Sequence, residues 1–203
     1  MIRLGSVGES EPDPDLSRRN VRLGALVLLV LLGAVGLSLA RGSGSGDDAP
    51  QLSGPLRESL EQNGCTVDSR ADKGQKHVTS ASYSVNPPAG GDHLAAATPA
   101  GFYNLANVPA DGNLVHSLEH GFVVVWYRPD GVSGATVDGL RELARSRKWV
   151  LVVPRPTLPT ALAVTAWRRR LLCPDAADAL RADGPIGNFV TAFRNQGPEK
   201  GFV

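Results

Sequence analysis

The sequence predicts an α+β fold, in which a small mixed β-sheet packs with helices and is preceded by one N-terminal transmembrane helix. Two short runs predict the core of the sheet: FVVVWY (122–127) and WVLVVP (149–154) are rich in β-branched and aromatic residues and are bounded by turn residues. Between them, residues 137–148 place apolar side chains on one helical face and charges opposite, which is typical of an amphipathic helix. A strand, a helix and a strand of these lengths favour a right-handed parallel crossover.

Shorter patterns predict the other elements. Apolar residues four positions apart, followed by Gly64, indicate a short helix, whereas alternating residues ahead of Pro87 indicate a strand. The other expected elements are a helix over 52–64, a strand over 77–85, a third core strand over 161–167 antiparallel to the second, and helical segments around 175–183 and 188–195.

Two groups of side chains have an ordinary structural interpretation. Trp126, Tyr127, Trp149 and Trp167 lie on or beside the expected strands, so we interpret them as core or rim aromatics rather than a ligand cage. The basic run 168–170 is typical of a solvated face, with anionic lipid headgroups as the alternative contact.

The N-terminal part of the chain carries a candidate membrane span. Residues 23–40 (LGALVLLVLLGAVGLSLA) contain no charge, and 18 helical residues span roughly 27 Å, enough for a hydrocarbon core. Four arginines precede this run, but only Arg41 stands between it and the acidic pair at 47–48. The positive-inside bias therefore predicts a cytoplasmic N-terminus and an extracytoplasmic C-terminal domain. The four arginines are Arg3, Arg18, Arg19 and Arg22.

The expected organisation follows from this span. A cleaved signal peptide is the alternative, because Ser38-Leu39-Ala40 resembles a cleavage site, but the long polar leader favours an uncleaved anchor. The membrane is thus the one partner that the sequence predicts. The predicted parts are a cytoplasmic tail (1–22), a transmembrane helix (23–40), a flexible Gly/Ser-rich linker (41–50) and an extracytoplasmic α+β domain (51–203).

Composition bounds the class of protein. The 203 residues are 42% hydrophobic and 20% charged, which suits one folded domain with an appendage. Lys+Arg 21 against Asp+Glu 20 leaves a net charge of +1, without a clustered basic face. Nucleic acid is therefore not an expected partner.

Two cysteines, Cys65 and Cys173, fall in the part expected outside the cytoplasm, where a disulfide can form and persist. A bridge would close a long loop, and the chain-entropy model gives it on the order of 4 to 5 kcal/mol, usually less in practice. We expect a structural disulfide rather than two free thiols. A thiol oxidoreductase is disfavoured because the chain has no CxxC spacing.

All four histidines lie between residues 77 and 120: His77, His93, His116 and His120. Residues four apart point to the same side in a helix and in a strand, so His116 and His120 face one way in either case. The direction in which Glu119 points distinguishes a helix from a strand. On a helix, H-x-x-E-H is the inverzincin arrangement, in which two imidazoles hold zinc and the carboxylate is the general base. The space between Gly112 and Gly121 allows only about two helical turns, which is short for that enzyme motif.

Three functional hypotheses remain open. The leading one is a non-enzymatic module that binds zinc or copper(II) through His116 and His120 with His93 and His77, because three or four imidazoles suit these metals. A thioether copper(I) site is excluded, since Met1 is the only methionine and lies in the predicted cytoplasmic tail. The alternatives are a metal-dependent hydrolase with Glu119 as general base, and a metal-free envelope interaction module whose histidines are structural hydrogen-bonding groups.

Several blocks of the chain resemble one bacterial family, domain of unknown function 3105 (DUF3105), over residues 65 to about 199. The resemblance implies a common architecture, often behind one transmembrane helix, and a shared site built from His93, His116, Glu119 and His120, but no activity. The chain departs from the family pattern at Ala89 and Gly90, where hydroxyl residues are usual. The matching blocks are HV (77–78), Tyr83, PPAGGDH (87–93), GFY (101–103), LVHSLEHGFVVVWYRP (114–129), VVPRP (152–156), LAVTAWRRRLLC (162–173) and GPE (197–199).

Overall fold

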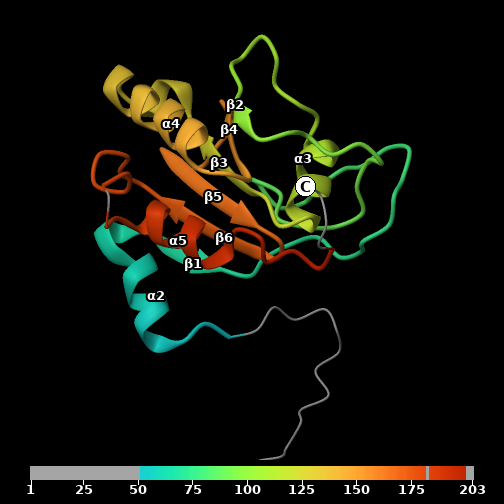
Figure 1. Cartoon of the computed structure of the whole chain (residues 1–203), viewed down its shortest axis with the longest axis horizontal. Coiled ribbons are helices and arrows are strands. Elements are labelled where there is room, and N and C mark those ends of the chain that lie inside the picture. Colours follow the sequence, from blue (N-terminus) through green and yellow to red (C-terminus); the bar gives the residue numbers. More distant parts are fainter. Residues whose placement is uncertain (1–50, 182, 200–203) are drawn as a thin grey trace, which may run out of the picture. The chain divides into compact units, whose positions relative to one another are not determined.

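The computed structural model describes residues 51–181 and 183–199 (Figure 1). The predicted cytoplasmic tail, transmembrane helix and linker, all within residues 1–50, lie outside the described residues. Among the residues described, no helix is both long enough and hydrophobic enough to cross a bilayer.

One mixed sheet organises the domain, with its strands in the order β1-β6-β5-β3-β4-β2. β4 lies parallel to both β3 and β2, whereas β5 lies antiparallel to β3 and β6, and β1 antiparallel to β6. The α+β class with a mixed sheet is therefore confirmed. The strands are β1 (Thr66–Asp68), β2 (Gly101–Phe102), β3 (Val123–Tyr127), β4 (Val150–Pro154), β5 (Leu162–Ala166) and β6 (Arg169–Cys173).

The helices begin and end with recognisable signals. The Ser133 hydroxyl accepts a hydrogen bond from the Thr136 amide and caps α4, while proline stands in the first turn of α2 and α5, where its missing N–H costs nothing. The helices are α2 (Gly54–Leu60), α3 (Asp111–Glu119), α4 (Gly134–Ser146) and α5 (Pro185–Phe193), with short 3₁₀ turns η1 (Gln62–Gly64) and η2 (Pro129–Gly131).

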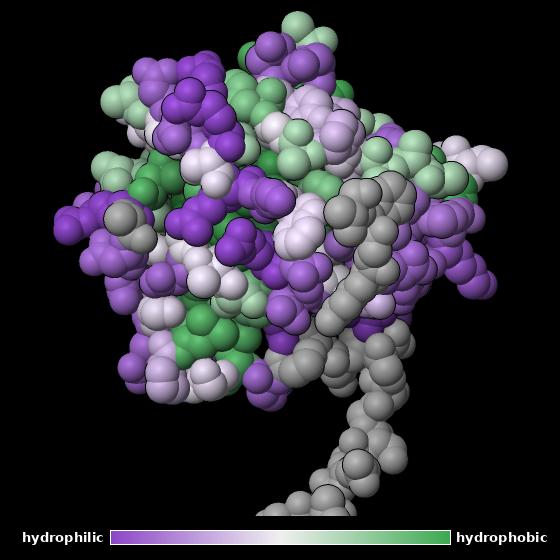
Figure 2. Space-filling view, in the orientation of Figure 1, coloured by the Kyte–Doolittle hydropathy of each residue, from purple (hydrophilic) through white to green (hydrophobic). Residues whose placement is uncertain are grey.

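The sheet separates two apolar cores because side chains alternate along its strands. Val123 and Val125 of β3 belong to the cluster that includes residues of α2, α4 and α5, whereas Val124 and Trp126 belong to the cluster that includes Leu118 of α3. Helix α3 thus covers one face of the sheet, and helices α2, α4 and α5 cover the opposite face. On the surface seen in Figure 2, hydrophilic side chains dominate and hydrophobic ones appear in small separate areas, since most apolar residues are buried against the sheet.

The predicted core strands are confirmed to within a residue or two, and so is the parallel pairing of the first with the second. The amphipathic helix is also confirmed, as α4. The third strand, β5, pairs with β3 rather than with β4 as its neighbour, because β2 occupies the free edge of β4.

Two predicted elements are wrong. The segment 77–85 is not a strand, since only His77 makes a bridge, with His93, and the amides of Ser84 and Val85 donate to the Asp72 carboxylate instead of to a neighbouring strand. Residues 175–181 form turns rather than a helix, and the helix predicted near 188–195 is α5.

The interpretation of the basic run 168–170 as a solvated face is also wrong. Arg169 and Arg170 belong to β6 and are only 7% and 5% exposed. Arg170 is neutralised by Asp68 of the neighbouring β1, at 2.8 Å, and the Arg169 guanidinium lies 6.0 Å from the centre of the Phe193 ring. Partners distant in the sequence therefore allow these cations to be buried.

The predicted disulfide is confirmed: Cys65, just after η1, is bonded to Cys173 at the end of β6. Both cysteines lie in the core cluster beneath α2 and α5. The bridge therefore ties the first described elements to the sheet.

Candidate metal centre

The site is built on α3, which is buried along most of its length. Leu114 and Leu118 pack α3 against the sheet. The Arg155 guanidinium donates to both carboxylate oxygens of Asp111, in the first turn of α3, at 2.7 and 3.0 Å. A carboxylate in the first turn also complements the helix dipole. His116 and Glu119 therefore lie on a helix and not on a strand. This helix, α3, has nine residues and ends at Glu119.

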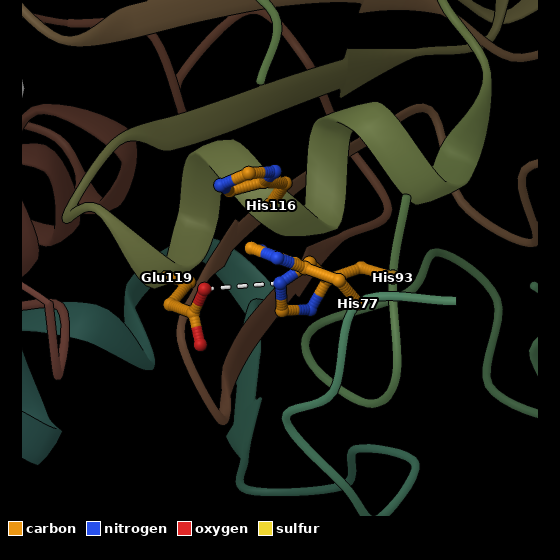
Figure 3. Close-up of side chains that lie close together, drawn as sticks. All are labelled: His77, His93, His116 and Glu119. Carbon is orange, nitrogen blue, oxygen red and sulfur yellow. Dashed lines mark ion pairs between the residues drawn. The ribbon is translucent and has the colours of Figure 1, made fainter. Parts of the chain in front are cut away.

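His116 and Glu119 are three positions apart on α3 and point to the same side of it (Figure 3). Both are buried, with 4% of His116 and 1% of Glu119 exposed. A buried carboxylate is costly unless a cation or hydrogen bonds compensate it. The groups around Glu119 therefore determine its role.

His77 and His93 come from the irregular segment between β1 and β2, and two backbone hydrogen bonds hold them side by side. The Val78 amide donates to the His93 carbonyl at 2.8 Å, and the His93 amide donates to the Lys76 carbonyl at 2.9 Å. The Asp92 carboxylate also accepts from the Lys76 amide, at 2.9 Å. The two imidazoles are therefore placed by the backbone and do not depend on a regular strand.

Four side chains converge beside α3, as Figure 3 shows: His77, His93, His116 and Glu119. Each offers one ligand atom, and these four atoms all lie within 4.8 Å of one another. The ring centres of the three histidines are 4.7 to 5.1 Å apart. His77 is exposed whereas the other three are buried, so solvent reaches the group from the His77 side.

Backbone carbonyls fix the protons of two of these rings. His93 Nδ1 lies 2.9 Å from the Gly91 carbonyl oxygen, and His116 Nδ1 lies 2.8 Å from the Leu94 carbonyl oxygen. Because a carbonyl only accepts, each Nδ1 carries the proton, and in the neutral ring Nε2 carries a lone pair. Metal-binding histidines in proteins are commonly oriented in this way.

The contact between His93 and Glu119 is unusual. His93 Nε2 lies 2.9 Å from Glu119 Oε2, and both side chains are almost completely buried. Despite this distance, His93 Nε2 and the other carboxylate oxygen, Oε1, have no hydrogen-bond partner among the described residues. His93 Nε2 and Glu119 Oε2 thus lie together in the interior, where one bound cation would contact both atoms.

The charge state of His116 also suits a ligand. Burial lowers the pKa of His116 below its ordinary value of 6.5, and the nearby imidazoles of His93, His120 and His77 lower it further, although the hydrogen bond to Leu94 acts in the opposite direction. The ring is therefore neutral at pH 7. Neutral imidazole is the form that binds metals.

His120 lies next to this group but is not one of the four. It is the C-cap residue of α3, and its Nε2 is 2.9 Å from His116 Nε2, consistent with the predicted shared face. The position among the three other histidines is filled by Glu119, which the spacing alone suggested only as a general base. The backbone carbonyls that orient His93 and His116 could not be identified from the residue types.

Comparison with known proteins places this site within one family. Residues 75–203 match the model described as Protein of unknown function (DUF3105). The chain belongs to the DUF3105 family. All four converging side chains fall in the matched part of this DUF3105 protein, whereas Cys65 precedes it. No curated protein and no solved structure matches the chain.

Proposed function

We propose that this DUF3105 domain is a non-enzymatic module that binds a divalent transition metal, zinc or copper(II), through His77, His93, His116 and Glu119. The observation that carries the proposal is the meeting of His93 Nε2 and Glu119 Oε2, two buried ligand atoms 2.9 Å apart. The lone pair that the Gly91 carbonyl leaves on His93 Nε2 supports it further.

The donor set fits the chemistry of these metals. Three imidazole nitrogens and one carboxylate oxygen make a four-ligand set of the kind that zinc accepts, at about 2.0 to 2.2 Å from each atom. Imidazole also suits copper, whereas calcium and magnesium prefer oxygen ligands. With one ligand exposed at the surface, such a site can exchange its metal with solvent or with a carrier, which suits storage or transfer.

The position of Glu119 favours the role of a ligand over that of a general base in a hydrolase. A base must reach a water or a substrate, but this carboxylate is 1% exposed and one of its oxygens lies against His93. The hydrolase alternative needs the carboxylate to face an open cleft.

We also propose that the domain is held outside the cytoplasm by the uncharged run 23–40. A disulfide in the domain is compatible with that location. The full-length protein should remain in the membrane pellet after alkaline carbonate extraction, with its C-terminus cleaved by protease added to intact cells stripped of their wall. Release by carbonate, or protection of the C-terminus in intact cells, would contradict this.

The metal proposal is tested by stripping the full-length chain with a chelator, adding Zn²⁺, and measuring bound metal and affinity. The informative variant is His77→Ala, since His77 is exposed and its removal leaves the core intact. We expect at least one Zn²⁺ per chain in the wild type, and an affinity at the four-residue site weakened roughly 100-fold or more in the variant. Lys76→Ala, at the neighbouring exposed position, is the matched control and should bind as the wild type does.

Failure of the wild type to bind Zn²⁺ or Cu²⁺ while remaining folded would overturn the proposal and leave the metal-free interaction module. Binding that His77→Ala and a second variant, His93→Gln, both leave unchanged would place the metal elsewhere. The thermal stability of each metal-free variant shows whether it is folded.

A further inference from the structure

The second oxygen of Glu119 is not accounted for by the site described above. In Figure 3 the contact with His93 uses one carboxylate oxygen, while the other points away from the three imidazoles drawn. That oxygen, Oε1, is buried without a hydrogen-bond partner among the residues described. An unsatisfied carboxylate oxygen in the interior costs stability unless something positive binds it.

A second group of ligand atoms lies beside the first and shares this carboxylate. Glu119, His120 and Glu199 each offer one ligand atom, and the three atoms lie within 4.8 Å of one another. His120 also faces the first group, since its Nε2 is 2.9 Å from His116 Nε2. The two groups are therefore adjacent.

The chain brings Glu199 to this position by a close packing of two backbone segments. The Glu199 amide donates to the Glu119 carbonyl at 3.1 Å, and the Asn195 amide donates to the Gly121 carbonyl at 2.7 Å. A Cβ at Gly197 would lie 2.0 Å from the Glu119 carbonyl oxygen, so only glycine fits there. Residues 197–199 thus pack directly against the end of α3, and Glu199 comes to lie beside the Glu119 side chain.

We propose that Glu119, His120 and Glu199 form a second divalent-cation site, and that the Glu119 carboxylate bridges the two cations of a dinuclear centre. The inference rests on the proposed function for the first site. Each oxygen of a bridging carboxylate binds one cation, which explains why one oxygen lies at His93 while the other is buried and unsatisfied. In two-metal sites the cations are about 3.5 to 4 Å apart, a spacing that one carboxylate spans.

The second set differs from the first in composition and exposure. It has two carboxylates and one imidazole, and Glu199 is exposed while Glu119 is buried. The negative charges of Glu119, between the two cations, and of Glu199, beside the second cation, offset part of the repulsion between the cations. Because fewer protein ligands surround it, the second cation should bind more weakly than the first and exchange faster.

The test is a titration of the metal-stripped full-length chain with Zn²⁺, followed by calorimetry and by elemental analysis of the filtered protein. We expect two equivalents in the wild type and one in Glu199→Gln, which removes one exposed carboxylate without touching the first site. Glu58→Gln removes an exposed carboxylate from α2 and is the matched control, which should still bind two. Two equivalents of Cu²⁺ should give an electron paramagnetic resonance spectrum of two coupled ions.

The outcomes separate this inference from the proposal on which it rests. One equivalent in the wild type, lost in His77→Ala, would overturn the second site and leave the first intact. No equivalent in either protein would overturn both. Binding of two equivalents by Glu199→Gln would show that Glu199 is not a ligand of the second cation. Two bound Cu²⁺ ions without magnetic coupling would show that Glu119 does not bridge them.

Discussion

At the level of single residues, the decisive contact is that between His93 and Glu119. Either a shared proton or a cation can hold a nitrogen and a carboxylate oxygen 2.9 Å apart in the interior. A proton shared between them would align the two groups as a hydrogen bond, but His93 Nε2 has no such partner among the described residues. Two ligands of one cation need no such alignment, and for this reason the geometry favours a metal over an imidazolium-carboxylate pair.

Replacing Glu119 by glutamine separates these two explanations. The variant keeps the shape of the side chain and removes its charge. If the carboxylate is a metal ligand, metal-free Glu119→Gln should be at least as stable as the metal-free wild type, because a buried charge is gone, but Zn²⁺ should no longer raise its melting temperature. Thermal unfolding with and without Zn²⁺ measures both effects.

The opposite result would indicate that His93 and Glu119 form a structural ion pair. In that case Glu119→Gln would destabilise the metal-free protein by about 3 to 5 kcal/mol, as is usual when one partner of a buried pair is removed. Zn²⁺ would affect neither protein. Glu58→Gln, on the exposed surface of α2, controls for the loss of one negative charge.

The lowered pKa of His116 predicts a pH dependence of stability. In the unfolded chain this ring takes up a proton near its ordinary pKa of 6.5, whereas in the folded protein it does so only at lower pH. The contribution of His116 to stability is therefore present above pH 6.5 and is lost as the pH falls below it. Urea unfolding of the metal-free protein at pH 7.5 and 5.5 should show this loss, and a smaller one in His116→Gln.

The same protonation should release the metal, because an imidazolium cannot be a ligand. Zn²⁺ affinity is thus expected to fall steeply between pH 7 and 5. An affinity independent of pH over this range would contradict binding by histidines.

At the level of elements, the junction between α3 and the C-terminal segment determines whether both ligand groups can form. Gly121 ends the turn after α3 with φ +84°, and a Cβ there would lie 2.8 Å from the Asn195 Cα. Gly121→Ala should therefore destabilise the protein by about 1 to 3 kcal/mol and reduce Zn²⁺ binding.

Gly134 is the matched control, since it lies in α4 and a Cβ there would meet nothing within 4 Å. Gly134→Ala should be neutral or stabilise by up to about 1 kcal/mol. Chemical denaturation of both variants measures the difference. Equal effects of the two substitutions would show that the close packing at Gly121 is unimportant.

The elements that the sequence predicts well are those whose pattern reflects burial alone. β3 and β4 are continuous apolar runs, β5 is apolar except for Thr165, and α4 has one apolar face, so local residues suffice to identify these elements. β6 was not predicted because its arginines resemble a solvated segment. The burial of Arg170 depends on Asp68, 102 positions before it, and Arg169 lies near the ring of Phe193.

The candidate site was predictable to the extent that spacing determines it. A separation of four residues placed His116 and His120 on one side of the chain, and the clustering of the histidines added His93 and His77. The family resemblance placed Glu119 in a shared site with His93, His116 and His120. The position of Glu199 depends on the packing of Gly197 against the end of α3, which no local pattern encodes. The role of Glu119 depends on the backbone bridge that brings His93 to it.

At the level of the whole molecule, the disulfide and the site lie on opposite faces of the sheet. Cys65 and Cys173 belong to the core beneath α2 and α5, whereas α3 covers the other face. Replacing both cysteines by alanine should lower the free energy of unfolding by roughly 2 to 4 kcal/mol, because the bridge joins residues 108 positions apart.

Zn²⁺ affinity of the folded cysteine variant should be unchanged. Guanidinium unfolding and a Zn²⁺ titration of the same sample measure the two quantities. A loss of affinity without a loss of stability would mean that the two faces are coupled through the sheet, contrary to their separate packing.

The most direct measurement is X-ray absorption spectroscopy at the metal edge of the full-length protein loaded with a single equivalent of Zn²⁺. We expect a shell of nitrogen and oxygen atoms at about 2.0 to 2.2 Å, with the outer scattering of three imidazoles, and fewer imidazoles in His77→Ala. A shell of water oxygens without imidazole scattering, or a spectrum unchanged by His77→Ala, would contradict binding by His77, His93, His116 and Glu119.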